Sequence, residues 1–207
     1  MSSPWNKLAT KKQIDETVKN LTANGMTAFV VNNEDEAKAK VLELIPENSE
    51  VMTMSSETLR LSGITDAINE SSKFDSVKVK LSKMNRETQS LEMQKLGAAP
   101  EYAIGSVHAV TEDGQVIIAS NTGSQLPAYV YASPHVIWVV GTQKIVKNTE
   151  EGIKRIYDYV LPKESVRLAK QYDRPGLKSN VSKLLIVNKE FNPDRVTIIL
   201  VKESVGF

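Results

Sequence analysis

Apolar and polar positions alternate along the first third of the chain in segments that predict strands and helices in turn. Residues 27–32 and 50–54 are short apolar runs typical of buried strands. The intervening helices are indicated by apolar residues at helical spacing: Ile14, Val18 and Leu21 before Gly25, and Ala37, Val41, Leu44 and Ile45 after the capping residue Asn33. Strands and helices in this order predict parallel βαβ units.

The pattern changes to strand, turn and strand from residue 102. Residues 102–112 and 115–120 flank Asp113-Gly114, a dipeptide preferred in two-residue type I′ hairpin turns. Residues 122–131 predict a short helix that ends near Ser133-Pro134. Residues 136–141 predict the most clearly buried strand.

The last quarter of the chain predicts one helix and two strands. Asn148 can cap a helix whose apolar face holds Ile153, Ile156, Val160 and Leu161, and which ends at Pro162. Residues 181–187 and 196–201 predict strands joined by a turn at 192–194. The whole chain, 1–207, therefore predicts one α/β domain with a mixed, largely parallel sheet flanked by helices. In this interpretation residues 1–24 are an N-terminal helical extension, and residues 50–203 carry most of the motifs.

Composition excludes several classes of protein. Without cysteine there is no disulfide framework, no cysteine-bound zinc or iron–sulfur cluster, and no thiol nucleophile. A formal charge of +1 with interspersed signs disfavours a nucleic-acid or anionic-membrane surface. The apolar runs are too short to span a bilayer, and residues 1–16 contain no secretory signal, so we expect a cytoplasmic protein.

Nucleotide-binding and metal-binding motifs are also missing from the sequence. There is no Gly-x-Gly-x-x-Gly after a strand and no phosphate loop of the Walker type. The two histidines, His108 and His135, lack the HExxH spacing of a zinc site. We therefore expect neither a metal nor a cofactor in this chain, although a carboxylate-bound magnesium, which nothing in the sequence requires, stays open as an alternative.

Two polar clusters are candidates for chemistry. Glu112 follows an apolar strand beside a turn, where a carboxylate can act as nucleophile or general base, or simply be solvated. Asn121-Thr122-Gly123-Ser124-Gln125 precedes a predicted helix, whose free N–H groups attract anions. Gly123 would let an anion approach the backbone closely. Helix capping by one of these residues is the alternative.

Four further residues are candidates of the same kind. Ser56 and Thr58 follow a predicted parallel strand, at the sheet edge where α/β proteins bind ligands, although capping also explains them. Lys144 lies in a polar turn after residues 136–141 and can pair with an anionic ligand or with Glu112, or remain solvated. His108 lies within a predicted strand and is interpreted as a hydrogen-bonded structural residue rather than an acid–base catalyst.

A family resemblance runs through most of the chain in order. Its main segments are Gly105-Ser106 with Ala109 to Gly114, then Asn121 to Gln125, and then Val139 to Gly141 with Lys144 to Val146. Agreement continues at Ser56 to Leu59, at Glu151 to Arg155, and at Val201 to Glu203 with Gly206-Phe207. These segments resemble the lactate-utilisation (LUD) domain family.

The resemblance implies a fold similar to the CoA-transferase and ribose-phosphate-isomerase group, and a connection to bacterial oxidation of lactate to pyruvate. It also implies iron–sulfur partner proteins. Some LUD relatives carry cysteines before their last strands, whereas residues 171–188 here have none, so any clusters would belong to a partner. Thr111-Glu112-Asp113-Gly114 also resembles the Ser-Glu-Asn-Gly segment of certain CoA transferases, whose glutamate attacks the acyl-CoA.

Three functions follow as hypotheses: a LUD-type protein that binds a small anionic ligand in a cleft, a transferase or isomerase that uses Glu112, and a non-catalytic subunit that docks an iron–sulfur oxidoreductase. Whether the chain is an enzyme, and whether it forms a homo-oligomer, stays open. Candidate ligand-binding residues are Ser56, Thr58, Ser106, His108, Asn121, Thr122, Gly123, Ser124, Gln125 and Lys144.

Overall fold

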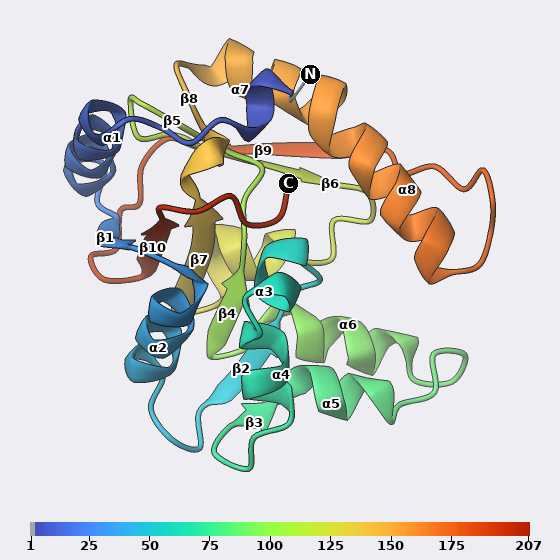
Figure 1. Cartoon of the computed structure of the whole chain (residues 1–207). Helices are drawn as coiled ribbons and strands as arrows, with labels where there is room; N and C mark the ends of the chain where they lie inside the picture. Colours follow the sequence, from blue (N-terminus) through green and yellow to red (C-terminus); the bar gives the residue numbers. More distant parts are fainter. Residues whose placement is uncertain (1–2) are drawn as a thin grey trace.

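A computed structural model describes residues 3–207, which form two β-sheets flanked by helices (Figure 1). The larger sheet has the strand order β1-β10-β7-β4-β2-β3, and all of its pairings are parallel. Its strands are Thr27–Val31 (β1), Glu50–Thr53 (β2), Asp75–Ser76 (β3), Tyr102–Gly105 (β4), His135–Gly141 (β7) and Val196–Val201 (β10). The predicted α/β class and the parallel βαβ units of the first third are confirmed.

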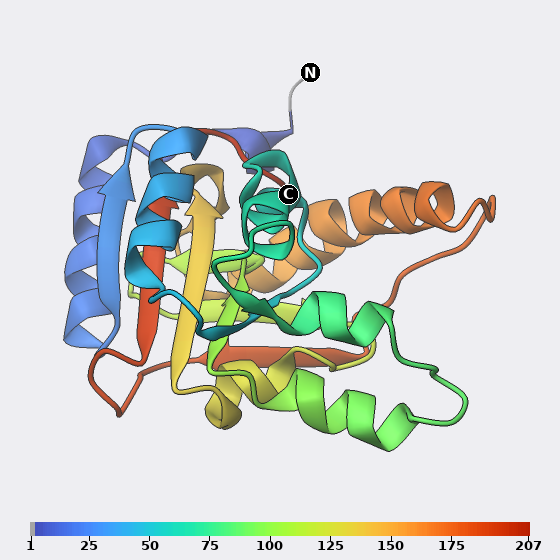
Figure 2. The ribbon, with the colours of Figure 1, turned by 90° about the horizontal axis from the view of Figure 1, so that it is seen from below.

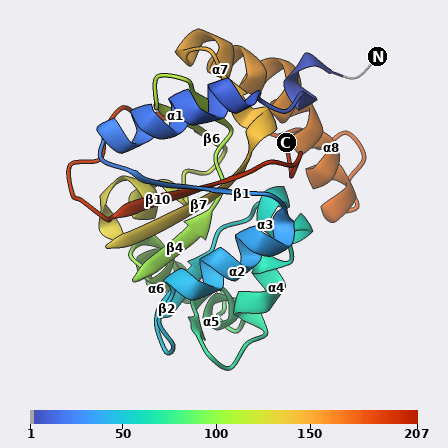
Figure 3. The same cartoon turned by 60° about the vertical axis from the view of Figure 1, so that its left-hand side comes forward.

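The larger sheet is buried on both faces, as parallel sheets usually are. Along β7, Val136, Trp138 and Val140 join one apolar core, while Ile137 and Val139 join another on the opposite face. Figure 3 shows α1 (Lys11–Ala23) on one face of the sheet and α2 (Glu34–Leu44) on the other. The second core also takes in α3 (Glu57–Leu61) and α4 (Ile64–Asn69), whereas α5 (Val77–Ser82) and α6 (Ser90–Ala98) pack against the first.

The smaller sheet has the strand order β8-β5-β6-β9 and is mixed, since β5 pairs with β8 in parallel and the other pairings are antiparallel. Its strands are Ala109–Thr111 (β5), Val116–Ser120 (β6), Ile145–Val146 (β8) and Lys183–Val187 (β9). Helix α7 (Thr149–Arg155) packs against it and continues through a π-helical turn, Ile156–Val160 (η4), into α8 (Leu161–Gln171). Figure 2 shows α8 reaching out beyond the strands of the larger sheet.

The predicted end of this last helix at Pro162 is wrong. Pro162 lies in the first turn of α8, directly after η4. Because α7, η4 and α8 form one continuous helix, Pro162 lies inside it, directly after the π-helical turn, where the regular α-helical hydrogen-bond pattern is already interrupted. The predicted cap is confirmed, because Asn148 Oδ1 accepts the Glu151 N–H at 3.0 Å.

The single strand predicted over residues 102–112 is in fact two strands in different sheets. β4 belongs to the larger sheet and β5 to the smaller one, and Ser106-Val107-His108 connects them. Val107 is buried, so the apolar pattern continues across the break and does not reveal the change of sheet. This connection lies where the two sheets meet.

The predicted hairpin exists, but its turn differs from the prediction. Gly114 has φ 77° and its N–H donates to the Thr111 carbonyl at 2.9 Å, which closes a three-residue loop. A type I′ turn needs positive φ at both central residues, and Asp113 does not have it. Glycine in the left-handed region is typical of the three-residue hairpin loop.

The helix predicted over residues 122–131 begins later than expected. Residues 121–125 are irregular, and the π-helical turn η2 (Ala128–Ala132) ends before Ser133, near the predicted end. Within the proposed extension 1–24, α1 contributes Ile14 and Leu21 to the first core, while Met1 and Ser2 lie outside the described residues. None of the helices in residues 3–207 is long and apolar enough to cross a membrane.

Candidate functional site

A cavity of about 460 Å³ lies where the two sheets meet. One wall comes from segments that follow strands of the larger sheet, a second from the end of β6 and the polar residues after it, and a third from η4, α8 and residues 177–181. The sequence-predicted residues that line it are Ser56, Thr58, Ser106, His108, Asn121, Thr122, Ser124, Gln125 and Lys144. The structure thus brings together residues from four separate stretches of sequence.

The first wall is built at the carboxyl ends of three parallel strands. Ser56 and Thr58 follow β2, Ser106 follows β4, and Lys144 follows β7 in the short 3₁₀ turn η3 (Thr142–Lys144). Because β2, β4 and β7 run parallel, these ends meet at one edge of the sheet. Ser56 also caps α3, with its Oγ 3.4 Å from the Leu59 N–H, so both of its predicted roles fit its position.

Lys144 is a deeply buried charged residue of the cavity wall, with 1% of its surface exposed. Its Nζ lies 2.8 Å from Thr58 Oγ1, 3.1 Å from Ser106 Oγ and 3.3 Å from the Val107 carbonyl oxygen. All three partners are uncharged. Burial lowers the pKa of the Lys144 ammonium well below its usual range, and the charge of Arg155 lowers it further.

Arg155 is a second buried cation, which the sequence interpretation did not single out. It lies at the end of α7 with no exposed surface, and its Nη1 donates to the His108 carbonyl at 2.5 Å. Among the described residues, no hydrogen-bond partner is found for its buried Nε and Nη2. Burial lowers its pKa to about 10, so the guanidinium remains charged at neutral pH.

Two cations therefore bind consecutive carbonyl groups of the β4–β5 connection, Val107 by Lys144 and His108 by Arg155. Within residues 3–207 neither cation forms an ion pair with a carboxylate. Buried charges are normally paired, because transfer of each ion from water costs several kcal/mol. An unpaired pair of cations beside a cavity gives that cavity a positive potential.

The His108 side chain is a neutral hydrogen-bond acceptor beside these cations. Its Nδ1 accepts the Ala119 N–H at 3.0 Å, which places the proton of the neutral ring on Nε2. Desolvation, then the charges of Lys144 and Arg155, lower the pKa of His108 to about 3. This geometry agrees with the structural interpretation of His108, although the residue also lines the cavity.

The polar cluster after β6 is bonded mainly to itself. Ser120 Oγ accepts the Gly123 N–H at 2.8 Å, and Thr122 Oγ1 accepts the Ser124 N–H at 3.3 Å. Its backbone donors are thus partly occupied, and no regular helix follows directly. The side chains of Asn121, Thr122, Ser124 and Gln125 still line the cavity.

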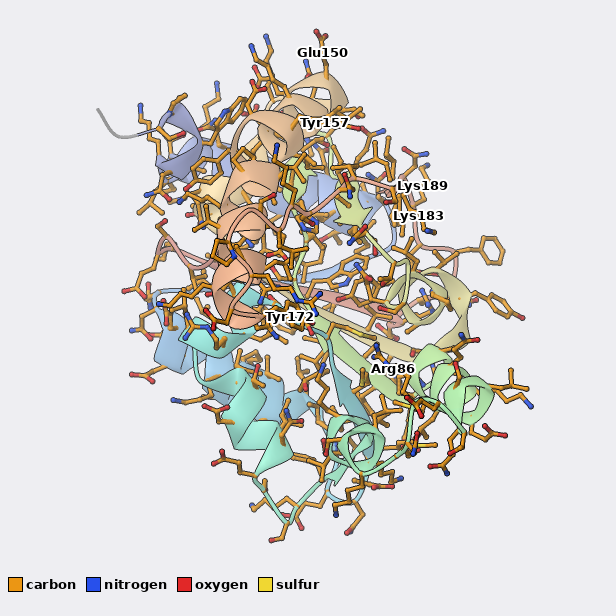
Figure 4. The ribbon with its side chains drawn as sticks, turned by 90° about the vertical axis from the view of Figure 1, so that its right-hand side faces the viewer. Arg86, Glu150, Tyr157, Tyr172, Lys183 and Lys189 are labelled. Atoms are coloured by element: carbon orange, nitrogen blue, oxygen red, sulfur yellow. The ribbon has the colours of Figure 1, made fainter. Side chains whose placement is uncertain are left out.

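Two predicted positions lie outside the cavity. Gly123 has φ 88° and faces the side chain of Lys183, labelled in Figure 4, since a Cβ at Gly123 would lie 2.7 Å from Lys183 Cδ. Glu112 lies in the hairpin loop, where its Oε1 accepts a hydrogen bond from Gln13 Nε2 at 2.8 Å. The structure therefore does not bring these two residues into the cavity: the hairpin carries Glu112 toward α1, and Gly123 faces Lys183.

The third wall adds charged groups that the sequence interpretation did not assign. Glu164 on α8 is paired with Arg167 at 2.7 Å. Tyr172, at the end of α8, also lines the cavity and is labelled in Figure 4. Lys78 on α5 lines the cavity outside this wall. It is half-buried, its Nζ lies 3.2 Å from Ser55 Oγ, and burial lowers its pKa. Among the described residues, no group of three His, Asp or Glu side chains is placed to hold a metal ion.

The C-terminal residues close the cavity beside Lys144. The Gln143 amide donates to the Val205 carbonyl at 3.0 Å, and Thr58 Oγ1 lies 3.3 Å from the same oxygen. Gly206 has φ 65°, and a Cβ there would lie 2.4 Å from Thr58 Oγ1. Phe207 then lines the cavity.

Fold and site together define a single-domain α/β protein with a polar, cation-flanked cavity at the carboxyl ends of parallel strands. Residues 14–201 match the family model described as the LUD domain, and the chain belongs to this family, which is associated in general with lactate utilisation. None of the curated proteins gives a match. A solved structure described as a DUF162 family protein from Deinococcus radiodurans is similar in fold, with a TM-score of 0.58, 12% sequence identity, and coverage of 94% of this chain and 99% of that one.

Proposed function

We propose that this LUD-domain protein binds a small anionic metabolite in the cavity and acts in the bacterial pathway that oxidises lactate to pyruvate. The observation that carries the proposal is the buried pair Lys144 and Arg155, which has no carboxylate partner within residues 3–207. An anion in the cavity would offset the buried positive charge of Arg155, which no carboxylate among the described residues neutralises.

The other charged side chains around the cavity also favour a negatively charged ligand. Of its acidic side chains, Glu57 is paired with Arg60 and Glu164 with Arg167. Lys78 and Lys178 form no ion pair among the described residues. Among the described side chains that line it, the cavity therefore offers unpaired cations and no unpaired carboxylate.

The size and polarity of the cavity suit a metabolite rather than a macromolecule. About 460 Å³ lies within the range of small-molecule sites. Hydroxyl groups of Ser56, Ser106 and Thr58, and the amide groups of Asn121 and Gln125, can donate hydrogen bonds to carboxylate or phosphate oxygens. Within this proposal the protein works in the cytoplasm.

The test is a thermal-shift and calorimetric titration with lactate, pyruvate, a short acyl-CoA and ribose 5-phosphate. A saturable stabilisation by at least one anion is expected. Lys78→Met should weaken that binding about tenfold, the effect of losing about 1.4 kcal/mol of charge interaction. Lys189→Met is the matched control, because Lys189 is exposed and does not line the cavity (Figure 4). Absence of any shift with well-folded protein would refute the proposal.

A second candidate function is docking of an iron–sulfur oxidoreductase, favoured by exposed apolar side chains on neighbouring segments. Tyr131 on η2 is 86% exposed and Phe191 is 95% exposed. Arg195 joins the two segments, since its Nη2 donates to the Ala128 carbonyl at 3.0 Å and its Nη1 pairs with Glu190 at 2.7 Å. If this candidate is right, the purified iron–sulfur subunits of the same organism's lactate-oxidation system should co-elute with the protein, and Tyr131→Ser with Phe191→Ser should abolish co-elution.

A further inference from the structure

The Lys144 amine has neighbours that a purely structural ion pair would not have. Its three partners within 3.3 Å are two hydroxyl groups and a carbonyl oxygen, and all of them belong to residues that line the cavity. No carboxylate holds it in the ammonium form among the described residues. A lysine in such surroundings can act as a nucleophile when it is neutral.

We propose that Lys144 forms an imine with a small carbonyl compound that carries a carboxylate or a phosphate. This inference rests on the proposed function, because it names the substrate class of the same cavity. The amine requires a carbonyl group in the ligand, and the unpaired cations require an anionic group. Lys78 lines the cavity, and Arg155 adds a buried positive charge behind His108 in its wall, so the anionic group of the ligand has partners other than Lys144.

The neighbouring guanidinium favours the reactive form of Lys144. Arg155 and Lys144 bind adjacent carbonyl groups, so the charge of the guanidinium disfavours a second positive charge on Lys144. A lysine that is desolvated and lies next to another cation is an activated nucleophile. The lowered pKa of Lys144 agrees with this arrangement.

The reaction balances without an oxidant or a reductant. The nitrogen lone pair of Lys144 forms a bond to the carbonyl carbon, and the carbonyl oxygen takes up a proton to give a carbinolamine. Loss of that hydroxyl as water, together with the second nitrogen proton, leaves the C=N bond. The Thr58 and Ser106 hydroxyls lie 2.8 and 3.1 Å from Nζ and can carry protons between nitrogen and oxygen.

The experiment traps the imine by chemical reduction. The full chain is incubated with pyruvate, with ribose 5-phosphate, or with neutral acetone, and sodium cyanoborohydride is added to reduce any imine to a stable secondary amine. The expected result is one adduct per chain, mapped by peptide mass spectrometry to Lys144, with an anionic carbonyl compound and about tenfold less with acetone. The two anionic compounds distinguish a carboxylate ligand from a phosphate ligand.

Two variants define the site. Lys144→Met should lose the adduct, and Lys189→Met should keep it, because Lys189 is exposed and lies outside the cavity. If Lys144→Met does not fold, peptide mapping on the wild-type chain still decides the question. Adducts spread over surface lysines, or equal labelling by acetone, would overturn the inference.

Binding and trapping fail in distinguishable ways. A saturable thermal shift with pyruvate or ribose 5-phosphate but no adduct would overturn the imine and leave the proposed anion binding intact. Absence of both the shift and the adduct would overturn both proposals.

Discussion

Replacement of His108 by asparagine is expected to make the protein less sensitive to acid. In the folded chain His108 Nδ1 accepts the Ala119 N–H, and Lys144 and Arg155 lie nearby. Protonation of the ring would break that hydrogen bond and add a third positive charge. Asparagine can accept the same N–H through Oδ1 and does not titrate.

The magnitude follows from the pKa of His108, which is about 3 in the folded protein against 6.5 for an ordinary histidine. Because the folded pKa is the lower one, the unfolded chain binds more protons between these values, and the free energy of unfolding falls as the pH falls through this window. The full difference corresponds to about 5 kcal/mol, at 1.4 kcal/mol per pH unit. Because His108 is only half-buried and faces the cavity, we expect a smaller effect. The free energy of unfolding should fall by about 2 to 3 kcal/mol by about pH 4.

The assay is urea unfolding followed by circular dichroism, at intervals from about pH 7.5 to about pH 4. The free energy of unfolding of wild type, relative to that of His108→Asn, should fall by about 2 to 3 kcal/mol across this pH range. His135→Asn removes the other histidine and is the matched control. Parallel pH profiles for wild type and His108→Asn, or the same change in the His135→Asn protein, would refute the reasoning.

Three further variants test the packing and the limits of the site. Leu21→Ala in α1 should lower the free energy of unfolding in urea by about 2 to 5 kcal/mol, because Leu21 is fully buried in the first core. A change near zero would mean that α1 does not contribute to the stability of that core. Gly105→Ala should lower the free energy of unfolding by about 1 to 3 kcal/mol, because the new Cβ would lie 1.7 Å from Tyr129 Oη. Gly97→Ala is the control and should not destabilise the protein, because no atom lies nearer than 3.8 Å to its Cβ. Glu112→Gln should leave ligand affinity in calorimetry unchanged, because Glu112 lies outside the cavity; a tenfold loss would return Glu112 to the site.

Much of the first cavity wall could be predicted because its signals are local. Ser56 and Thr58 directly follow a strand in a βαβ pattern, and the carboxyl ends of parallel strands meet at one edge. The Asn33 and Asn148 caps could be predicted for the same reason. In each, the asparagine side-chain oxygen accepts a hydrogen bond from the backbone N–H of the residue three positions later. Local chemistry decides such features almost alone.

The environment of Lys144 could not be predicted, because it depends on contacts far along the sequence. Its partner Thr58 is 86 positions away, and the neighbouring Gln143 binds Val205, 62 positions further on. Glu112 was misplaced because the hairpin tip turns toward α1, which is a tertiary contact. One feature of the sequence pointed to Arg155: it lies next to Ile156, on the apolar face of the predicted helix. A cation buried at such a position needs a partner or a ligand.

The π-helical turn η4 sets the rotational phase of the helix that crosses both the smaller sheet and the cavity. Gly152, Ile156, Val160, Glu164 and Leu168 are each four residues apart, and all are buried or line the cavity. In a regular α-helix such positions drift by about 40° per step, or about 160° over four steps, which would place the two ends on nearly opposite sides. The extra residue of a π-helical turn takes up about 100° of this drift. One continuous helix thereby keeps Gly152 against the smaller sheet and Leu168 against the cavity, although no single helical repeat fits both.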